Sequence, residues 1–123
     1  MDVASVVTLT LPEIKAKKGA KIKLDSTFTA LITMESSGAT LTYTRSTNNG
    51  PHEIIIRVNV DITVDDPILP NLTWVDEPIN GCHIYKATLV IENVSATFNA
   101  RAFNAIVFDE SNKIPRLVNT QVN

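Results

Sequence analysis

The stretch from residue 21 to residue 35 carries the longest alternation of apolar and polar side chains in the sequence. Its apolar members share one parity, and Leu31 is the one exception: Ile22, Leu24, Phe28, Ala30, Ile32 and Met34. A helix would need apolar residues three and four positions apart, whereas a strand with a period of two places them on one face. The pattern therefore predicts a long strand with one buried face.

The same period recurs along the rest of the chain. Val, Ile and Thr, which are stiff at χ1 and pack well on a pleated surface, make up about a third of the residues. We expect further strands at residues 3–11, 39–45, 52–64, 72–75, 84–93 and 97–109, and no helix. Asn49–Gly50 favours a type I′ hairpin turn, and Asn80–Gly81 predicts a second turn of hairpin type.

These segments amount to about seven to eight strands with a turn signal every 8–14 residues or so, which is typical of a sandwich. The predicted fold is an all-β, antiparallel, two-sheet β-sandwich, jelly-roll-like, in one domain at residues 1–110. Residues 111–123 are expected to form an extended C-terminal arm, and the strand at residues 3–11 is available for exchange between subunits. The predicted core contains Leu24, Phe28, Ile32, Leu41, Ile56, Val58, Leu89, Ile91 and Phe108.

Charge and hydropathy limit the partners of the chain. The formal net charge is −2 and charged residues are 20% of the chain, so there is no basic field for nucleic acid. No apolar run approaches the length of about 18 residues that a membrane span requires. Lysines follow the first apolar segment instead of preceding it, so no signal peptide is recognisable.

Cys82 is the only cysteine, which excludes a disulfide within the chain. The alternatives are an inert thiol, an intermolecular disulfide, and a nucleophile, which would need a base beside it. His83 is adjacent in sequence and would point to the opposite face of a strand. Cys82 and His52 would meet only if two turns came together. We expect both histidines to lie on the surface at strand ends.

No motif in the sequence specifies a reaction. The acidic residues between Asp61 and Glu77 favour a solvated loop, with a calcium site as the alternative. Trp74 is expected to be a core residue at a sheet end, and an exposed platform for a sugar is the alternative. We therefore assign no catalytic, cofactor-binding or metal-binding residue, expect no cofactor, and expect that the chain is not an enzyme.

Residues 72–108 resemble the second half of small jelly-roll modules found in phage tail and fibre proteins and in bacterial spore-surface proteins. In those modules a W-x-D-x-P loop leads through x-G-x-x-x-Y into a strand, and a final strand carries N/R-x-x-x-A-x-x-F. The matching positions are Trp74, Asp76, Pro78, Gly81, Tyr85, Arg101, Ala105 and Phe108. The resemblance implies a role at a surface or in an assembly.

Architecture and resemblance together favour a structural subunit that assembles with copies of itself into a filament or appendage, a spore layer or a virion component. The alternative is a β-sandwich module that binds a glycan or a receptor through loops 65–80 and 47–51. The expected partner is the chain itself, with a glycan or surface receptor under the alternative. The expected location is an extracellular surface assembly or a virion.

Overall fold

The computed structural model describes residues 4–66, 70–109 and 114–120. Within these residues it contains strands and no helix, so none of their segments is a helix long and apolar enough to cross a membrane. The strands are β1 (Ser5–Thr10), β2 (Ile14–Ala16), β3 (Lys21–Ile32), β4 (Ala39–Thr47), β5 (His52–Val60), β6 (Asn71–Asp76), β7 (Gly81–Ile91), β8 (Ala96–Phe108) and β9 (Arg116–Asn119).

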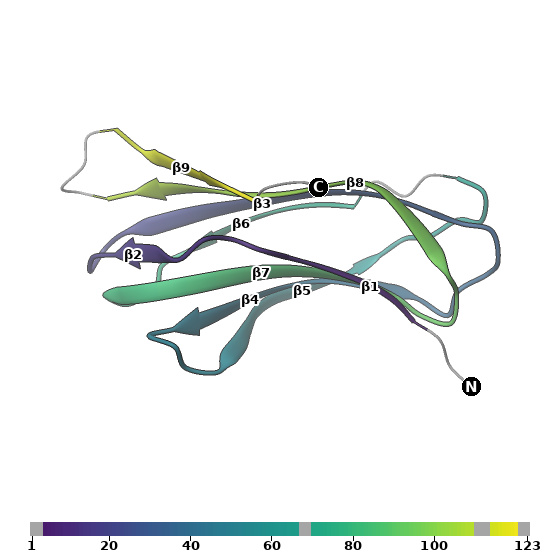
Figure 1. Cartoon of the computed structure of the whole chain (residues 1–123), viewed down its shortest axis with the longest axis horizontal. Coiled ribbons are helices and arrows are strands. Elements are labelled where there is room, and N and C mark those ends of the chain that lie inside the picture. The colour runs from purple at the N-terminus through teal and green to yellow at the C-terminus, as the bar shows by residue number, and fades with distance from the viewer. Residues whose placement is uncertain (1–3, 67–69, 110–113, 121–123) are drawn as a thin grey trace.

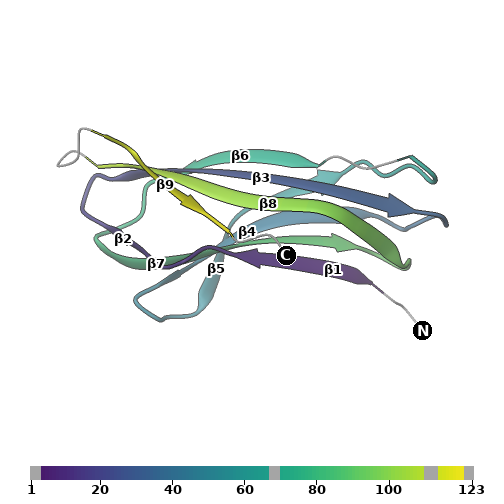
Figure 2. The same cartoon turned by 45° about the horizontal axis from the view of Figure 1, so that its top comes forward.

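The strands form two antiparallel sheets that face each other as layers (Figures 1 and 2). Sheet A has the order β1-β7-β4-β5, with β2 also paired to β7, and sheet B has the order β6-β3-β8-β9. The predicted all-β, antiparallel, two-sheet sandwich is confirmed. The described residues contain nine strands rather than seven or eight, because β2 and β9 are too short to show a clear alternation.

The alternation along β3 is the basis of the core. Leu24, Phe28 and Ile32 are fully buried between the sheets, as predicted, and so are Leu41, Leu89 and Ile91 from sheet A. Ile56 and Val58 face the core but are only partly buried. They lie on β5, an edge strand of sheet A, where no further strand covers them.

The prediction that Phe108 lies in the core is wrong, because its side chain is 44% exposed. The cause is a β-bulge in β8. Thr29 pairs with Ala100 and Ala30 pairs with Phe98, so Asn99 is left without a register partner. An extra residue reverses the parity of a strand. After the bulge the inward side chains are Phe103, Ala105 and Val107, and Phe108 points outward.

The β4–β5 hairpin has the predicted kind of turn at a position one residue earlier. Asn48 and Asn49 both have positive φ, at 51° and 63°, as the two central residues of a type I′ turn require. The turn is closed by a hydrogen bond from the Gly50 amide to the Thr47 carbonyl. Asparagine tolerates this conformation better than most residues other than glycine.

The C-terminal segment was expected to be an extended arm. Its described part includes β9, which pairs with Asn104–Val107 of β8 in the same chain. Val118 packs against the core, while Leu117 is exposed on the outer face. At the other end, β1 pairs with β7 of its own chain. Residues 1–3, 110–113 and 121–123 lie outside the described residues. They include Val3 of the predicted strand 3–11 and both ends of the predicted arm 111–123.

Candidate functional site

The edges of the two sheets are the first candidate for function. Sheet A is bordered by β5 on one side and by β1 with β2 on the other, and sheet B is bordered by β6 and β9. An edge strand presents unpaired backbone N–H and C=O groups that a strand from another chain can complete. Each sheet ends in such a strand at both of its edges, so a strand from another chain can pair at any of these edges.

Large apolar side chains are exposed on all of these edges. They are Val6 on β1, Ile54 on β5, Trp74 and Val75 on β6, and Leu117 on β9. Soluble sandwiches commonly protect an edge with lysine, proline or a bulge. The edge strand β5 has such a bulge, because Tyr43 pairs with Ile56 and Thr44 pairs with Ile54. The edge strands β1, β6 and β9 combine backbone hydrogen-bonding groups with apolar side chains, which suits them to contact with another protein chain.

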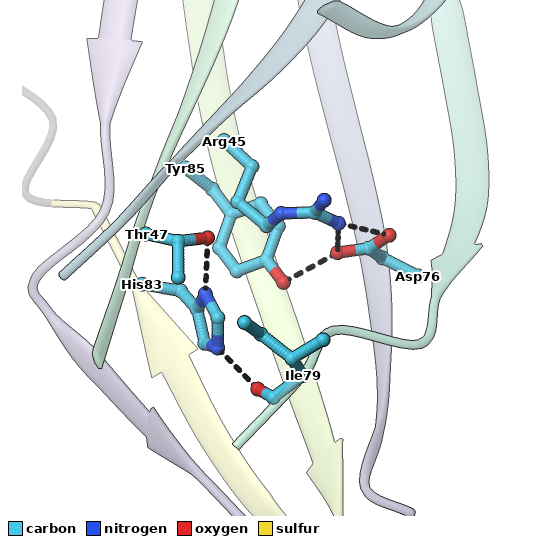
Figure 3. A network of polar contacts seen from close by, with 6 residues as sticks. All are labelled: Arg45, Thr47, Asp76, Ile79, His83 and Tyr85. Atoms are coloured by element: carbon cyan, nitrogen blue, oxygen red, sulfur yellow. Dashed lines mark hydrogen bonds and ion pairs between the residues drawn. The ribbon is translucent and has the colours of Figure 1, made fainter. Parts of the chain in front are cut away.

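A buried polar network fastens sheet A to β6 (Figure 3). The guanidinium of Arg45 on β4 donates to both carboxylate oxygens of Asp76 on β6, and each of these distances is 2.7 Å. The hydroxyl of Tyr85 on β7 donates to Asp76 Oδ2 at 2.6 Å. Burial raises the pKa of Tyr85, and so does the neighbouring Asp76 carboxylate. Burial lowers the pKa of Arg45, but the hydrogen bond and charge of Asp76 outweigh it, so this pKa lies above its ordinary value.

Tyr43 makes a second polar link between the sheets. Its Oη lies 2.6 Å from Ser26 Oγ on β3 and also hydrogen-bonds the carbonyl of Leu72 on β6. Its ring stacks at a tilt against Phe103, with 5.0 Å between the ring centroids. Burial raises the pKa of Tyr43 above its ordinary value. These links, with those of Asp76, hold β6 in a fixed position although it is an edge strand.

His83 is fully buried, so the prediction that it lies on the surface is wrong. It shares the inward parity of Tyr85 on β7, because β7 begins earlier than the sequence pattern indicated. His83 Nε2 lies 2.8 Å from the carbonyl oxygen of Ile79, which can only accept, so Nε2 carries the proton. Nδ1 lies 3.0 Å from the Thr47 hydroxyl, which can either donate or accept a hydrogen bond. Both nitrogens are engaged, and the ring acts as a structural bridge (Figure 3).

Cys82 points to the opposite face of β7 and is half-buried. A hydrogen bond to the Glu13 carboxylate raises the pKa of its thiol. His52, which is exposed, contacts the Thr44 hydroxyl at 3.3 Å. Cys82 contacts Glu13 and His52 contacts Thr44, so neither contact joins Cys82 to a histidine. A hollow of about 400 Å³ lies beside Cys82, and its lining includes Lys15 and Arg116.

The acidic residues of the stretch 61–77 do not share one partner. Asp76 is held by Arg45, and Glu77 forms an exposed ion pair with Lys21 at 3.5 Å. In the described parts of the chain, no three His, Cys, Asp or Glu side chains are grouped as metal ligands would be. Trp74 is 38% exposed on β6, so the prediction of a buried core tryptophan is wrong. Trp74 lies on an edge strand, which has β3 as its neighbour on one side of sheet B.

The network around Asp76 was missed at the level of sequence, although a signal was present. Arg45 has the same parity as Leu41 and Tyr43, so it had to face the interior. A buried arginine requires an acidic partner. The sequence offered several acidic residues after β5, and only the tertiary structure selects Asp76.

Comparisons with known proteins do not assign the chain to a family. No family model matches the chain, and no curated protein matches it. Among solved structures, it is similar to a chain in the structure of infectious bursal disease virus Gx strain, with a TM-score of 0.48 and 13% sequence identity. The alignment covers 97% of this chain and 33% of that one, so this chain spans about a third of its length.

Proposed function

We propose that this chain is a structural subunit that assembles with copies of itself, rather than an enzyme. The observation that carries the proposal is the exposure of large apolar side chains on the edge strands β1, β5, β6 and β9. Pairing between edges of neighbouring subunits would satisfy the free backbone groups and bury these side chains.

The links between the sheets suit such a role. Arg45, Asp76 and Tyr85 hold an edge strand in place, and Tyr43 holds it at a second point. A fixed edge pairs with a defined register, which a repeating assembly requires. The resemblance of residues 72–108 to jelly-roll modules of phage tails and spore surfaces supports the same role. A virion or an extracellular surface layer, filament or appendage is the setting that we propose.

The ends of the chain are candidates for exchange between subunits. Among the residues that the structure describes, β1 forms an edge of sheet A and pairs with β7 alone. Its place on β7 could be taken by the same strand from a neighbour with identical hydrogen bonds. We propose exchange of residues 3–11 as one route to assembly. Docking of the segment 111–123 on a neighbour is another, and it would require β9 to leave its place beside β8 of its own chain.

The edge proposal is tested by charging one edge. Lysine on an edge strand opposes edge-to-edge pairing. We expect Ile54→Lys on β5 to lower the mass of assemblies measured by light scattering and to shorten or abolish ordered particles in electron micrographs. Thr40→Lys is the matched control, because it lies on β4, which has strands on both sides. A wild-type protein that stays monomeric at all concentrations would refute the proposal.

A second candidate function is binding of a glycan or a receptor, and the exposed indole of Trp74 favours it. Trp74 is the only tryptophan, so its fluorescence reports directly on this site. Titration with a panel of soluble oligosaccharides should change the emission if the ring stacks on a sugar. An unchanged spectrum with every sugar would remove glycan binding at Trp74.

A further inference from the structure

The two ends of the sandwich, where its strands begin and stop, differ in charge. One end is formed by the segments 32–39, 60–66 and 91–96, which lie together on the right in Figure 1. Backbone hydrogen bonds join these segments, from the Asp65 amide to the Ile32 carbonyl and from the Glu92 amide to the Gly38 carbonyl, both at 2.9 Å. We call this the acidic end, because its charged side chains are all carboxylates: Glu35, Asp61, Asp65, Asp66 and Glu92.

The carboxylates of the acidic end have no counter-ion within the described parts of the chain. All five are exposed, and none of them forms an ion pair with a described residue. The segments 32–39, 60–66 and 91–96 contain no Lys, Arg or His. Among the described residues, no three of these carboxylates are grouped closely enough to share a metal ion. Their charge is therefore available to cations of another protein surface, and it opposes the packing of two acidic ends against each other.

The opposite end of the sandwich carries the hollow of about 400 Å³ beside Cys82. The hollow lies where β2 and the first residues of β7 and β9 come together, on the left in Figure 1. Lys15, Lys17 and Arg116 line it, together with one carboxylate, that of Asp109. Lys15 and Arg116 form no ion pair with a described residue, and the Arg116 guanidinium donates to the Lys15 carbonyl at 3.1 Å instead. We call this site the basic hollow.

The surroundings of the basic hollow leave its positive charge uncompensated. The Glu13 carboxylate is hydrogen-bonded to the Cys82 thiol, and Glu77 is paired with Lys21 at 3.5 Å. Lys18, in the turn between β2 and β3, is exposed and forms no ion pair with a described residue. The described residues at this end therefore contain more cations than carboxylates that could neutralise them.

Each end also exposes large apolar side chains. Met34 at the acidic end is 71% exposed. Ile79 and Ile114, in the segments that lead into β7 and β9 at the other end, are exposed as well. Exposed ion pairs contribute little affinity by themselves and chiefly set the choice and orientation of a partner. Burial of the apolar side chains would supply the affinity of a contact between the two ends.

We propose that the acidic end of one copy of the chain docks at the basic hollow of the next copy. Charge complementarity argues for this partner, because one chain carries both surfaces at opposite ends and a second copy supplies the missing counter-ions. The loop after β5 is held in place for docking, since Asp65 has a positive φ of 63° and its amide donates to the Ile32 carbonyl. A loop that is already ordered loses little conformational entropy on binding. We therefore assign the carboxylates of Asp61 and Asp66, on either side of this tip, to the cations of the basic hollow.

This inference rests on the proposed self-assembly and adds the contact that lengthens the assembly. Each copy in such a contact keeps one acidic end or one basic hollow free, so the contact repeats and builds a filament or a closed ring. The long strands run between the two ends (Figures 1 and 2), so successive copies would lie with their strands along the line of assembly. Edge pairing instead joins copies side by side, and the two contacts can coexist.

Charge reversal at each end tests the contact. The end variants are Lys15→Glu in the basic hollow and Asp66→Lys at the acidic end. The control is Lys86→Glu, which makes the same change of charge as Lys15→Glu but lies midway along β7. Association of the full chain is measured by sedimentation velocity over a range of concentrations. We expect each end variant to weaken association at least tenfold, because like charges then face each other, and the control to associate like the wild type.

A mixture of the two end variants gives a sharper result. Lys15→Glu keeps the native acidic end, and Asp66→Lys keeps the native basic hollow, so one native contact forms between the two chains. The equimolar mixture should associate at least tenfold more tightly than either variant alone. Added salt should weaken the association of the wild type, because it screens exposed charges.

Thermal unfolding accompanies each measurement, and the end variants lie at opposite ends of the sandwich, so a folding defect in one leaves the other to report. The inference is overturned if a folded end variant associates as tightly as Lys86→Glu, or if the mixture associates no more tightly than its components. Loss of assembly in Ile54→Lys alone would also overturn it and would leave the proposed assembly through edges standing. A wild-type chain that remains monomeric throughout would overturn this inference and the proposed function together.

Discussion

Arg45 and Asp76 are 31 positions apart in the sequence, yet the guanidinium lies 2.7 Å from both carboxylate oxygens. Arg45 belongs to sheet A and Asp76 to an edge strand of sheet B. The pair is largely shielded from water, with 21% and 10% of the two side chains exposed. It therefore acts as a link between the layers, and the stability of the sandwich should depend on it.

Asp76→Asn tests this link. The substitution keeps the shape but removes the charge, which leaves the Arg45 guanidinium enclosed without its counter-ion. Removing one partner of a buried pair typically lowers the free energy of unfolding by about 3 kcal/mol. Chemical denaturation of the variant should show a loss of that size.

Glu77→Gln is the control for Asp76→Asn, because it removes the exposed ion pair with Lys21. Exposed pairs contribute about 0–1 kcal/mol. Equal losses from the two substitutions would mean that the Arg45–Asp76 pair does not fasten the sheets.

The two tyrosines predict a loss of stability in alkali. The pKa values of Tyr43 and Tyr85 are both raised in the folded chain, chiefly by burial. An unfolded chain would release these protons near the ordinary tyrosine pKa of about 10, while the folded chain retains them. Stability from this source is complete below that pH and declines as pH rises above it.

Absorbance of tyrosinate near 295 nm measures this directly, since the chain has only these tyrosines. We expect no tyrosinate signal until the protein unfolds, and then a single cooperative rise. Tyr43→Phe and Tyr85→Phe should each reduce the pH dependence of unfolding by one proton. A gradual titration of the folded protein near pH 10 would contradict the burial of both hydroxyls.

The bulge in β8 makes opposite predictions for two phenylalanines. Phe103 is fully buried and packs on Tyr43, whereas Phe108 is exposed on the outer face. Phe103→Ala should lower the free energy of unfolding by about 3–5 kcal/mol because it leaves a cavity. Phe108→Ala should lower it by about 1 kcal/mol or less. Urea denaturation of the two variants decides the matter, and a larger loss from Phe108→Ala would place the bulge elsewhere.

The Cys82 thiol should react slowly. The hydrogen bond to Glu13 raises its pKa, so less thiolate is present at neutral pH than in a free cysteine. Alkylation by iodoacetamide at pH 8 should be slower than for a free thiol, and Glu13→Gln should accelerate it. Faster alkylation of the wild type would indicate an activated cysteine. Dimers on non-reducing gels that vanish in Cys82→Ser would establish the intermolecular disulfide.

Period-two patterning was sufficient to predict the architecture. Along β3 and β7 each inward residue repeats every second position, and a one-residue slip would turn every side chain to the wrong face. The sandwich, most of its strands and the burial of Phe28, Leu41 and Leu89 therefore follow from local sequence. The positive-φ turn before β5 was also predictable, since asparagine tolerates this conformation.

Tertiary structure alone decided the rest, for reasons that lie outside any single strand. The bulge at Asn99 depends on pairing between β8 and β3, so the outward position of Phe108 could not be derived from β8 alone. Which strands form edges depends on sheet order, and this order leaves Ile56 half-buried and Trp74 exposed. The partner of Arg45 depends on how strands distant in sequence are brought together. Local patterning sets which face of a strand is apolar, whereas only long-range pairing decides what that face meets.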